Sequence, residues 1–253
     1  MKGITSVVGM IISFAAIVAG IIILGGDINN FVNVPSILLT VVPTIGALVA
    51  TYPLSFLKKV PSHFKVILGG GYQPGEFVEA VSNFARRARI EGLLSLQNAQ
   101  ISDPSMQYCL TMIADGIDES EIRHFIEDSL AGLNDRHNEA ISFYEKGAAY
   151  APAFGMCATV ISLINMLMGL DFSDAAAINK LGGNMSAALI TTFYGSVLAN
   201  VVFLPLAGWM RYLHKREIFC KTIIYNGVLG IQRGDNPTYI SDSMREQLAK
   251  YEK

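Results

Sequence analysis

Charged residues are absent from four long stretches of this chain. Residues 3–26, 28–57, 147–170 and 181–210 contain no Asp, Glu, Lys, Arg or His. Each stretch reaches the roughly 20 mostly apolar residues that a membrane-spanning helix needs. Charged residues make up only 16% of the chain, against about 25% in soluble domains. This scarcity excludes an ordinary soluble protein and predicts an all-α membrane protein with four transmembrane helices.

Cysteine and histidine are also scarce. Only three cysteines occur, Cys109, Cys157 and Cys220, and their odd count without a close pair predicts neither a disulfide framework nor a zinc site. All four histidines lie outside the uncharged stretches, so a haem or metal site in the membrane would lack its commonest ligand. The net charge of −2 gives no reason to expect nucleic-acid binding. We expect no cofactor, no metal and no enzymatic active site.

The basic residues that are present determine the predicted topology. The segment between the second and third stretches opens with Lys58 and Lys59, and the tail opens with Arg211 and Lys215. The two short connecting segments contain only one basic residue between them, Lys180. Because cytoplasmic loops carry the excess of Lys and Arg, the long loop, the tail and both termini are predicted to be cytoplasmic. The first stretch is too long for a signal-peptide core and should be retained.

The chain therefore divides into four predicted regions. Residues 1–57 form transmembrane helices 1 and 2, residues 58–146 a helical cytoplasmic domain, residues 147–210 transmembrane helices 3 and 4, and residues 211–253 a cytoplasmic tail. Within the loop, apolar spacing predicts a helix over 76–100, and helix-start patterns predict others from 104 and 118. Residues 211–225 are expected to extend the fourth span.

Hydroxyl side chains replace charges inside the spans. Thr159 and Ser162 share a face of the third span, and Thr192 and Ser196 share a face of the fourth, beside Thr191. These groups either bind neighbouring helices and their own backbone carbonyls, or line a hydrated ion path. Transporters keep an ionisable group inside the bilayer. Because this chain has none there, the carboxylate of an ion path would have to come from another chain.

Two prolines lie near the predicted cytoplasmic ends of the third and fourth spans. Pro152 is expected near a helix start, where proline is well tolerated. Pro205 lies within an apolar helix and should loosen or kink it. Both are candidate hinges, although most such prolines are only structural.

A charged cluster lies on the first predicted helix of the loop. It consists of Arg86, Arg87, Arg89 and Glu91. This cluster is either a solvated face that also attracts anionic lipid, or a docking surface with salt-dependent recognition of a partner. Charge alone favours neither interpretation.

Several short segments follow one another along nearly the whole chain. They read GGDI at 25–28 and FVNVPSIL at 31–38, APAFGM at 151–156, ALITTFYG at 188–195 with PLA at 205–207, and GVLGIQ at 227–232 with NP at 236–237. Together with the predicted topology, they make the chain resemble the flagellar motor stator A subunits, the MotA/PomA family.

The resemblance implies a specific machine. Members of this family form a homopentamer around a dimer of a B subunit in the bacterial inner membrane. The B subunit contributes one transmembrane helix with an ion-carrying aspartate, and a peptidoglycan-binding domain. Flow of H⁺ or Na⁺ turns the ring of A subunits, whose cytoplasmic loop drives the switch protein of the rotor. The missing carboxylate would then come from the B subunit.

The resemblance also implies roles for residues of the spans. Pro152 and Pro205 match prolines that couple ion passage to movement. Thr192 matches a threonine near the B-subunit aspartate, and Thr159 matches a position that is threonine in sodium-driven members and often alanine in proton-driven ones. Hydroxyl oxygens suit a hard cation, so this pair leans towards Na⁺, although a proton path tolerates it too. The other candidates for the path are Thr191, Ser162 and Ser196.

In the loop, Arg89 matches an arginine that family members use against the rotor. The acidic partner of that arginine, expected eight residues further on, is Gln97 in this chain. Rotor binding is therefore assigned to Arg86, Arg87, Arg89 and Glu91 together with Gln97.

Two alternatives stay open. A related energiser of the ExbB/TolQ type would drive another periplasmic partner, but such proteins look three-spanning. A membrane scaffold or enzyme would conduct no ions. The spans contain no nucleophile–base pair and no metal ligands that would favour an enzyme.

Overall fold

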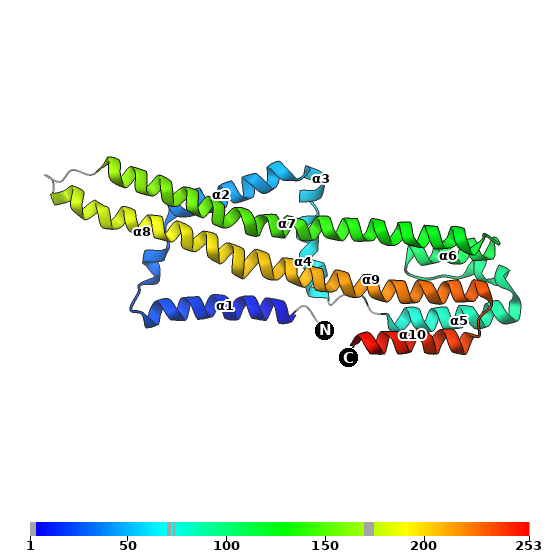
Figure 1. Cartoon of the computed structure of the whole chain (residues 1–253). Coiled ribbons are helices and arrows are strands. Elements are labelled where there is room, and N and C mark those ends of the chain that lie inside the picture. Colours follow the sequence, from blue (N-terminus) through cyan, green and yellow to red (C-terminus); the bar gives the residue numbers. More distant parts are fainter. Residues whose placement is uncertain (1–3, 70–71, 73, 170–174, 253) are drawn as a thin grey trace. The chain divides into compact units, whose positions relative to one another are not determined.

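The computed structural model describes residues 4–69, 72, 74–169 and 175–252, and these contain helices and turns but no strand. Four helices are long and apolar enough to cross a membrane. They are α1 (Ile4–Ile23), α2 (Val34–Thr51), α7 (Glu119–Met168) and the continuous run of α8 (Ala175–Val197), η3 (Leu198–Phe203) and α9 (Leu204–Arg233). The prediction of an all-α protein with four such helices is confirmed (Figure 1).

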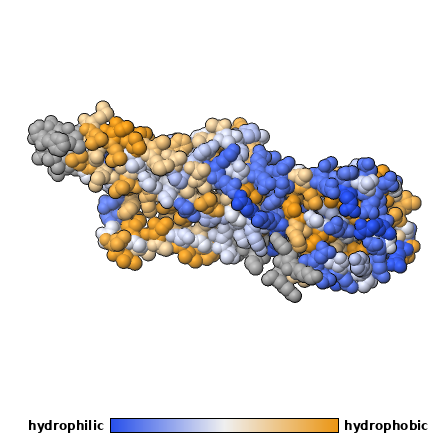
Figure 2. Space-filling model, viewed as in Figure 1, coloured by the Kyte–Doolittle hydropathy of each residue, from blue (hydrophilic) through white to orange (hydrophobic). Residues whose placement is uncertain are grey.

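The chain forms two compact units. Unit 1 comprises Met1–Gly70 and Glu139–Arg211, and unit 2 comprises Gly71–Asn138 and Tyr212–Lys253, so α7 and α9 contribute residues to both. Besides the spans, unit 1 contains η1 (Ile28–Phe31), α3 (Leu54–Leu57) and α4 (Val60–Gly69). Hydrophobic residues cover much of the surface of its long helices (Figure 2). Such a surface is expected where helices contact lipid or other transmembrane helices.

Local sequence explains where α2 begins and ends. The Asn33 side chain caps the helix by accepting a hydrogen bond from the Ser36 N–H at 3.0 Å. The helix ends at Tyr52, which is extended at φ −120° and ψ 142° because the following Pro53 disfavours helical backbone before it. The uncharged stretch over 28–57 is therefore a helix of 18 residues with a short helix on either side, rather than one long span.

The fourth span contains a π-helical segment, η3, which ends two residues before Pro205. Within it the helix makes wider turns, and the Leu204 N–H donates to the Ala199 carbonyl oxygen. Proline cannot donate to the preceding turn, and its ring crowds the carbonyl four residues earlier. A π-segment is one way in which a helix accommodates such a disturbance. The expected loosening at Pro205 therefore takes this form.

Unit 2 is a helical domain with its own apolar core. Its elements are α5 (Gly75–Glu91), η2 (Leu93–Asn98), α6 (Pro104–Ala114), α10 (Pro237–Glu252) and parts of α7 and α9. Val78, Val81 and Ala85 of α5 are buried in this core at helical spacing. The predicted helix over 76–100 is wrong beyond residue 91, because Gly92 adopts a φ of +83° and ends the helix.

The other helix boundaries follow the sequence more closely. α6 begins at Pro104, and α7 begins at Glu119, one residue after the predicted start. α9 continues to Arg233, so residues 211–225 do extend the fourth span. The predicted domain boundary between residues 146 and 147 falls inside the continuous helix α7.

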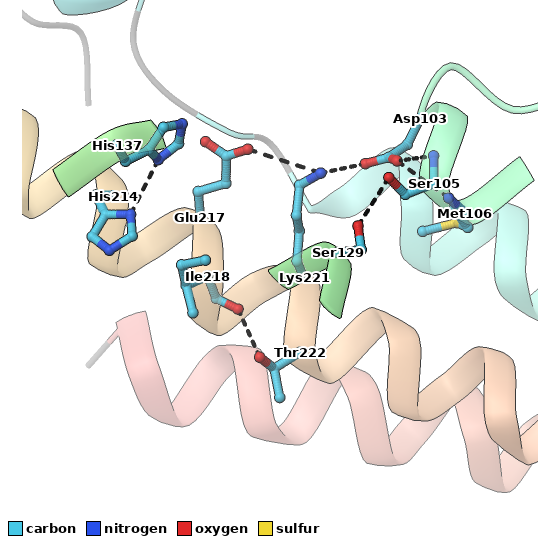
Figure 3. A network of polar contacts seen from close by, with 10 residues as sticks. All are labelled: Asp103, Ser105, Met106, Ser129, His137, His214, Glu217, Ile218, Lys221 and Thr222. Carbon is cyan, nitrogen blue, oxygen red and sulfur yellow. Dashed lines mark hydrogen bonds and ion pairs between the residues drawn. The ribbon is translucent and has the colours of Figure 1, made fainter. Parts of the chain in front are cut away.

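A buried ion pair connects α6 to α9 within unit 2 (Figure 3). Lys221 Nζ contacts Asp103 Oδ2, and the two side chains are only 13% and 7% exposed. Asp103 Oδ1 also accepts hydrogen bonds from the N–H groups of Ser105 and Met106 at 3.0 and 3.2 Å, which caps α6. Removing one member of such a pair leaves a buried charge uncompensated and costs about 3–5 kcal/mol.

A second polar contact in unit 2 joins α7 to α9 through His137 and His214, here called the histidine pair (Figure 3). Their Nδ1 atoms are 3.1 Å apart, and His214 Nε2 lies 3.0 Å from Asn134 Oδ1. Since an amide oxygen only accepts, His214 donates through Nε2 and accepts from His137 through Nδ1. This arrangement requires the His214 ring to be neutral, because its Nδ1 accepts the hydrogen bond from His137. Burial lowers the pKa of both imidazoles, which favours the neutral form of each ring.

Candidate ion path

Helices α7 and α8 approach each other closely at two glycines of unit 1. A Cβ atom on Gly195 would lie 2.6 Å from the Ala151 carbonyl oxygen and 3.1 Å from Pro152 Cα. A Cβ atom on Gly155 would lie 3.0 Å from the Thr191 carbonyl oxygen. Because every one of these neighbours is a backbone atom, no side chain can move aside to make room. Glycine at both positions therefore permits this helix separation.

Three threonines next to this contact, here called the threonine cluster, bring their hydroxyl groups together. Thr159 Oγ1 lies 3.0 Å from Thr191 Oγ1 and 2.6 Å from Thr192 Oγ1. The same atom lies 2.9 Å from the Gly155 carbonyl oxygen and 3.0 Å from the Ala188 carbonyl oxygen. Thr159 is thus the centre of a group of oxygen atoms supplied by both helices.

The threonine cluster is buried on one side and open on the other. Thr191 is fully buried, Thr159 is partly buried and Thr192 is exposed. Neutral oxygens so arranged can replace water around a hard cation or continue a hydrogen-bonded proton path, but they carry no charge. In the part of the chain that the structure describes, no group of three or more His, Cys, Asp or Glu residues is placed to hold a metal ion.

A second row of hydroxyl groups from α2 supports the threonine cluster. Thr40 Oγ1 contacts the Thr191 carbonyl oxygen at 3.5 Å, Thr44 Oγ1 donates to the Thr40 carbonyl oxygen at 2.6 Å, and Ser36 Oγ contacts the Ala187 carbonyl oxygen at 3.3 Å. Ser36, Thr40 and Thr44 are all buried. None is among the site residues expected from sequence, although their spacing of four places them on one helix face.

Tyr194 fixes the segment before α2 against α8. Its hydroxyl donates to the Phe31 carbonyl oxygen and accepts a hydrogen bond from the Asn33 N–H at 3.1 Å. Tyr194 lies two residues after Thr192 on α8, on a different face of the helix. No sequence signal pointed to this role, because it depends on a contact between residues 161 positions apart.

Two of the five hydroxyl residues expected in the path lie apart from the threonine cluster. Among the described residues, neither Ser162 nor Ser196 forms a hydrogen bond with its three threonines. Asn200 Nδ2 instead donates to the Ser196 carbonyl oxygen at 2.9 Å and lies 3.4 Å from Ser196 Oγ. Ser162 is partly buried on α7. Their part in an ion path stays a prediction.

The two candidate hinge prolines lie in different helical surroundings. Pro152 lies in the interior of α7, so the expectation that it lies near a helix start is wrong: α7 already begins at Glu119. Its Cα is one of the atoms that crowd Gly195. Pro205 follows η3, whose last residue, Phe203, lies against Gly147 of α7 with its ring 2.5 Å from the place of a Cβ atom.

The residues expected to bind the rotor lie at the end of α5 and in η2. Arg87 and Glu91 pair with each other, with Nε and Oε2 3.1 Å apart. Arg86 lines a hollow between α5 and α10 together with Arg245. Arg89 and Gln97 are exposed. The structure thus places all five residues in unit 2 and pairs only two of them.

The chain is similar to known proteins over nearly its entire length. Residues 97–221 match the family model of the MotA/TolQ/ExbB proton channel family. The chain is 37% identical to "Motility protein A" of Treponema pallidum (strain Nichols), and the match covers 97% of this chain and 96% of that protein.

Two solved structures share the fold. One is the flagellar MotAB stator complex from Bacillus subtilis, of which one chain is 29% identical with a TM-score of 0.82, covering 94% of this chain and 93% of that one. The other is C. jejuni MotAB, with a TM-score of 0.86 at 21% identity, covering 96% and 95% of the two chains. At that lower identity, the likeness concerns the fold alone.

Proposed function

Because the chain belongs to the motility protein A family, we propose that it is the A subunit of a flagellar stator. It forms an ion channel with a B subunit and converts an ion-motive force into rotation of the rotor. The single observation that carries the mechanism is the threonine cluster, an oxygen-lined site between uncharged helices. A site of this kind can accompany an ion but needs a carboxylate from a partner to hold it.

In this mechanism the B subunit supplies the charged carboxylate, and this chain supplies the uncharged hydroxyl groups that line the path. The aspartate of the B subunit binds the ion, and the hydroxyl groups of Thr192 and Thr159 replace part of its water as it passes. Thr191 holds the site in place through its buried contact with Thr40. Two more hydroxyl-bearing side chains, Ser162 of α7 and Ser196 of α8, extend the path. The ion is H⁺ or Na⁺, and the number of hydroxyl oxygens favours Na⁺.

Movement then passes from the threonine cluster to the two prolines. Pro152 packs next to Gly195, one helical turn from Thr192 and Thr191, so a displacement at the site reaches the proline directly. Pro205 and the π-segment before it provide a loosened part of the fourth span. One charge crossing 100 mV releases about 2.3 kcal/mol, which suits a step between equivalent ring positions rather than bond cleavage. No enzymatic reaction is part of this proposal, and no cofactor is required.

The assembly that goes with this function is a ring in the bacterial inner membrane. Five copies surround a B-subunit dimer, with both termini, the loop and the tail in the cytoplasm. The residues at the end of α5 and in η2 then contact the switch protein of the rotor. The excess of Lys and Arg in the loop and the tail supports this orientation.

A deletion tests the function itself. Cells without this protein, and without a second stator, should assemble flagella that do not turn, and re-expression should restore swimming. Normal swimming in the deletion strain would exclude the proposal. Loss of nutrient uptake or of envelope integrity with intact motility would instead support an ExbB/TolQ-type energiser, which the family model that matches residues 97–221 also includes by its description.

A substitution tests the ion. If Na⁺ drives the motor, swimming should depend on external Na⁺, and Thr159→Ala should abolish or alter that dependence. Ser13→Ala is the matched control, because Ser13 is exposed in α1 and its hydroxyl donates to the Gly9 carbonyl oxygen of its own helix at 2.9 Å. Motility that ignores Na⁺ but collapses with a protonophore would show that the motor is proton-driven, and would leave the stator assignment in place.

A further inference from the structure

Unit 2 exposes two large aliphatic side chains on either side of one turn. Ile90 is 85% exposed at the end of α5, and Leu94 is 73% exposed at the start of η2. Gly92 lies between them with a φ of +83°. Four residues span at most about 14 Å even when fully extended, so both side chains fit within the footprint of a single protein interface.

The fold of unit 2 does not depend on either side chain. Val81, Ala85 and Ala88 form the buried face of α5, whereas Ile90 projects away from the core. In η2 the residue Leu96 is fully buried and anchors the turn, whereas Leu94 points outward. Exposed aliphatic groups of this size contribute little to folding. Among the described residues of unit 2, no other large hydrophobic side chain is as exposed as these two, so this turn offers the largest apolar contact to a partner.

The surroundings of this apolar pair are basic. Arg86 and Arg89 are exposed on the same part of α5, and neither forms an ion pair with any residue that the structure describes, although Glu79 lines the same hollow as Arg86 and Arg245. Arg87 is already neutralised locally by Glu91 at 3.1 Å. The surface therefore presents two aliphatic side chains and two unneutralised guanidinium groups.

These properties select one kind of occupant. Two aliphatic side chains are too few for insertion into a membrane surface, which needs a continuous apolar helix face. A second copy of the chain presenting the same face would bring like charges together. A folded protein with an apolar pocket bordered by carboxylates satisfies both the aliphatic groups and the arginines, as central apolar anchors and peripheral charges do in other interfaces.

We propose that Ile90 and Leu94 are the apolar anchor of the surface that docks on the rotor, and that Arg86 and Arg89 steer the approach of its acidic face. This inference rests on the proposed stator function and assigns the binding strength to side chains that charge patterns do not reveal. Each group then has a separate effect: the aliphatic pair holds the complex together, and the arginines speed its formation in a salt-dependent manner.

The test measures binding of the purified, fluorescently labelled complex of this chain with its B subunit to isolated flagellar basal bodies that retain their rotor rings. Binding is compared at about 0.1 M and about 1 M salt, where the screening length is about 10 Å and about 3 Å. The variants are Ile90→Ser with Leu94→Ser, and Arg86→Gln with Arg89→Gln. The control is Tyr108→Ser with Tyr239→Ser, which removes exposed aromatic rings from other parts of unit 2.

We expect the aliphatic double variant to bind at least about tenfold more weakly at both salt concentrations, the scale of losing large buried apolar side chains. The arginine double variant should be weakened at low salt and approach the wild type at high salt. The control should bind as the wild type does. All variants should keep wild-type ion conduction and the size of the assembled complex, which shows that they are folded.

Three outcomes would overturn the inference. They are wild-type binding by the aliphatic double variant, an equal loss in the control, and a smaller assembly in the aliphatic variant, which would place these side chains between copies of the chain. Failure of the wild-type complex to bind basal bodies at all is distinguishable from these, because it would contradict the stator function itself.

Discussion

Replacing Gly195 by alanine should strongly reduce ion conduction while leaving the protein folded. The new Cβ atom would lie 2.6 Å from the Ala151 carbonyl oxygen. Carbon–oxygen contacts between helices are about 3.3 Å or longer, so α7 and α8 would have to separate by about 0.7 Å. The Thr159–Thr192 contact, now 2.6 Å between hydroxyl oxygens, would lengthen by a similar amount. The cluster would then lose the geometry of its shortest contact.

The cost to stability should be modest. Overpacking of this kind costs about 1–3 kcal/mol, and alanine recovers about 0.5–1 kcal/mol over glycine within a helix. The free energy of unfolding should therefore fall by about 2.5 kcal/mol at most. Displacements near 1 Å in a reaction site reduce rates by up to about 100-fold, so a displacement of about 0.7 Å should reduce conduction by roughly tenfold.

The assay is ion flux through the complex in membrane vesicles, with the amount of complex and its thermal midpoint measured in the same preparation. Gly208→Ala is the matched control, because a Cβ atom there has no neighbour within 4 Å. That variant should conduct as the wild type does and be slightly more stable. If Gly195→Ala conducts and turns the motor as well as Gly208→Ala, the close helix contact does not set the geometry of the path.

Three further predictions concern charge, pH and the fourth span. Lys221→Met should lower the free energy of unfolding by about 3–5 kcal/mol, because it leaves Asp103 buried without its partner. Adding Asp103→Asn should restore part of this loss, and a double variant no more stable than Lys221→Met would contradict the explanation. Because the folded-state pKa values of the histidine pair lie below 6.5, the unfolded chain binds more protons, so stability should fall as the pH drops below 6.5. His137→Gln should reduce this dependence in an acid titration, and the exposed His124→Gln should not. Pro205→Ala should convert the π-segment to regular α-helix, which would appear as slower amide exchange in that segment. The same variant should impair torque more than ion flux. Unchanged amide exchange would show that the proline does not cause the π-segment.

The spans could be predicted from sequence because one simple property, the absence of charge, suffices to identify them. The helix break at Gly92 was not predicted, because apolar residues continue on both sides of it and helical spacing alone gives no end point. The part played by Thr40 was missed for a different reason. A buried threonine in a membrane helix has the same local sequence whether it bonds its own backbone or, as here, a neighbouring helix.

The candidate path also combines features that sequence could predict with features that it could not. Thr159 and Thr192 were expected from a resemblance, and the structure places their hydroxyl oxygens 2.6 Å apart. Small residues such as Gly195 in the fourth span predict close packing against a neighbouring helix. Sequence does not reveal that Gly155 of α7 lies opposite, nor which backbone atoms face either glycine, because these are properties of the folded chain.

We infer that this chain forms an uncharged path and that a partner supplies the carboxylate. Ion flux can be measured into vesicles that contain this chain alone, the chain with its B subunit, or the chain with a B subunit whose intramembrane aspartate is changed to asparagine. We expect flux only with the unaltered B subunit. Flux through this chain alone, or undiminished flux with the asparagine variant, would show that the carboxylate of the partner is not required.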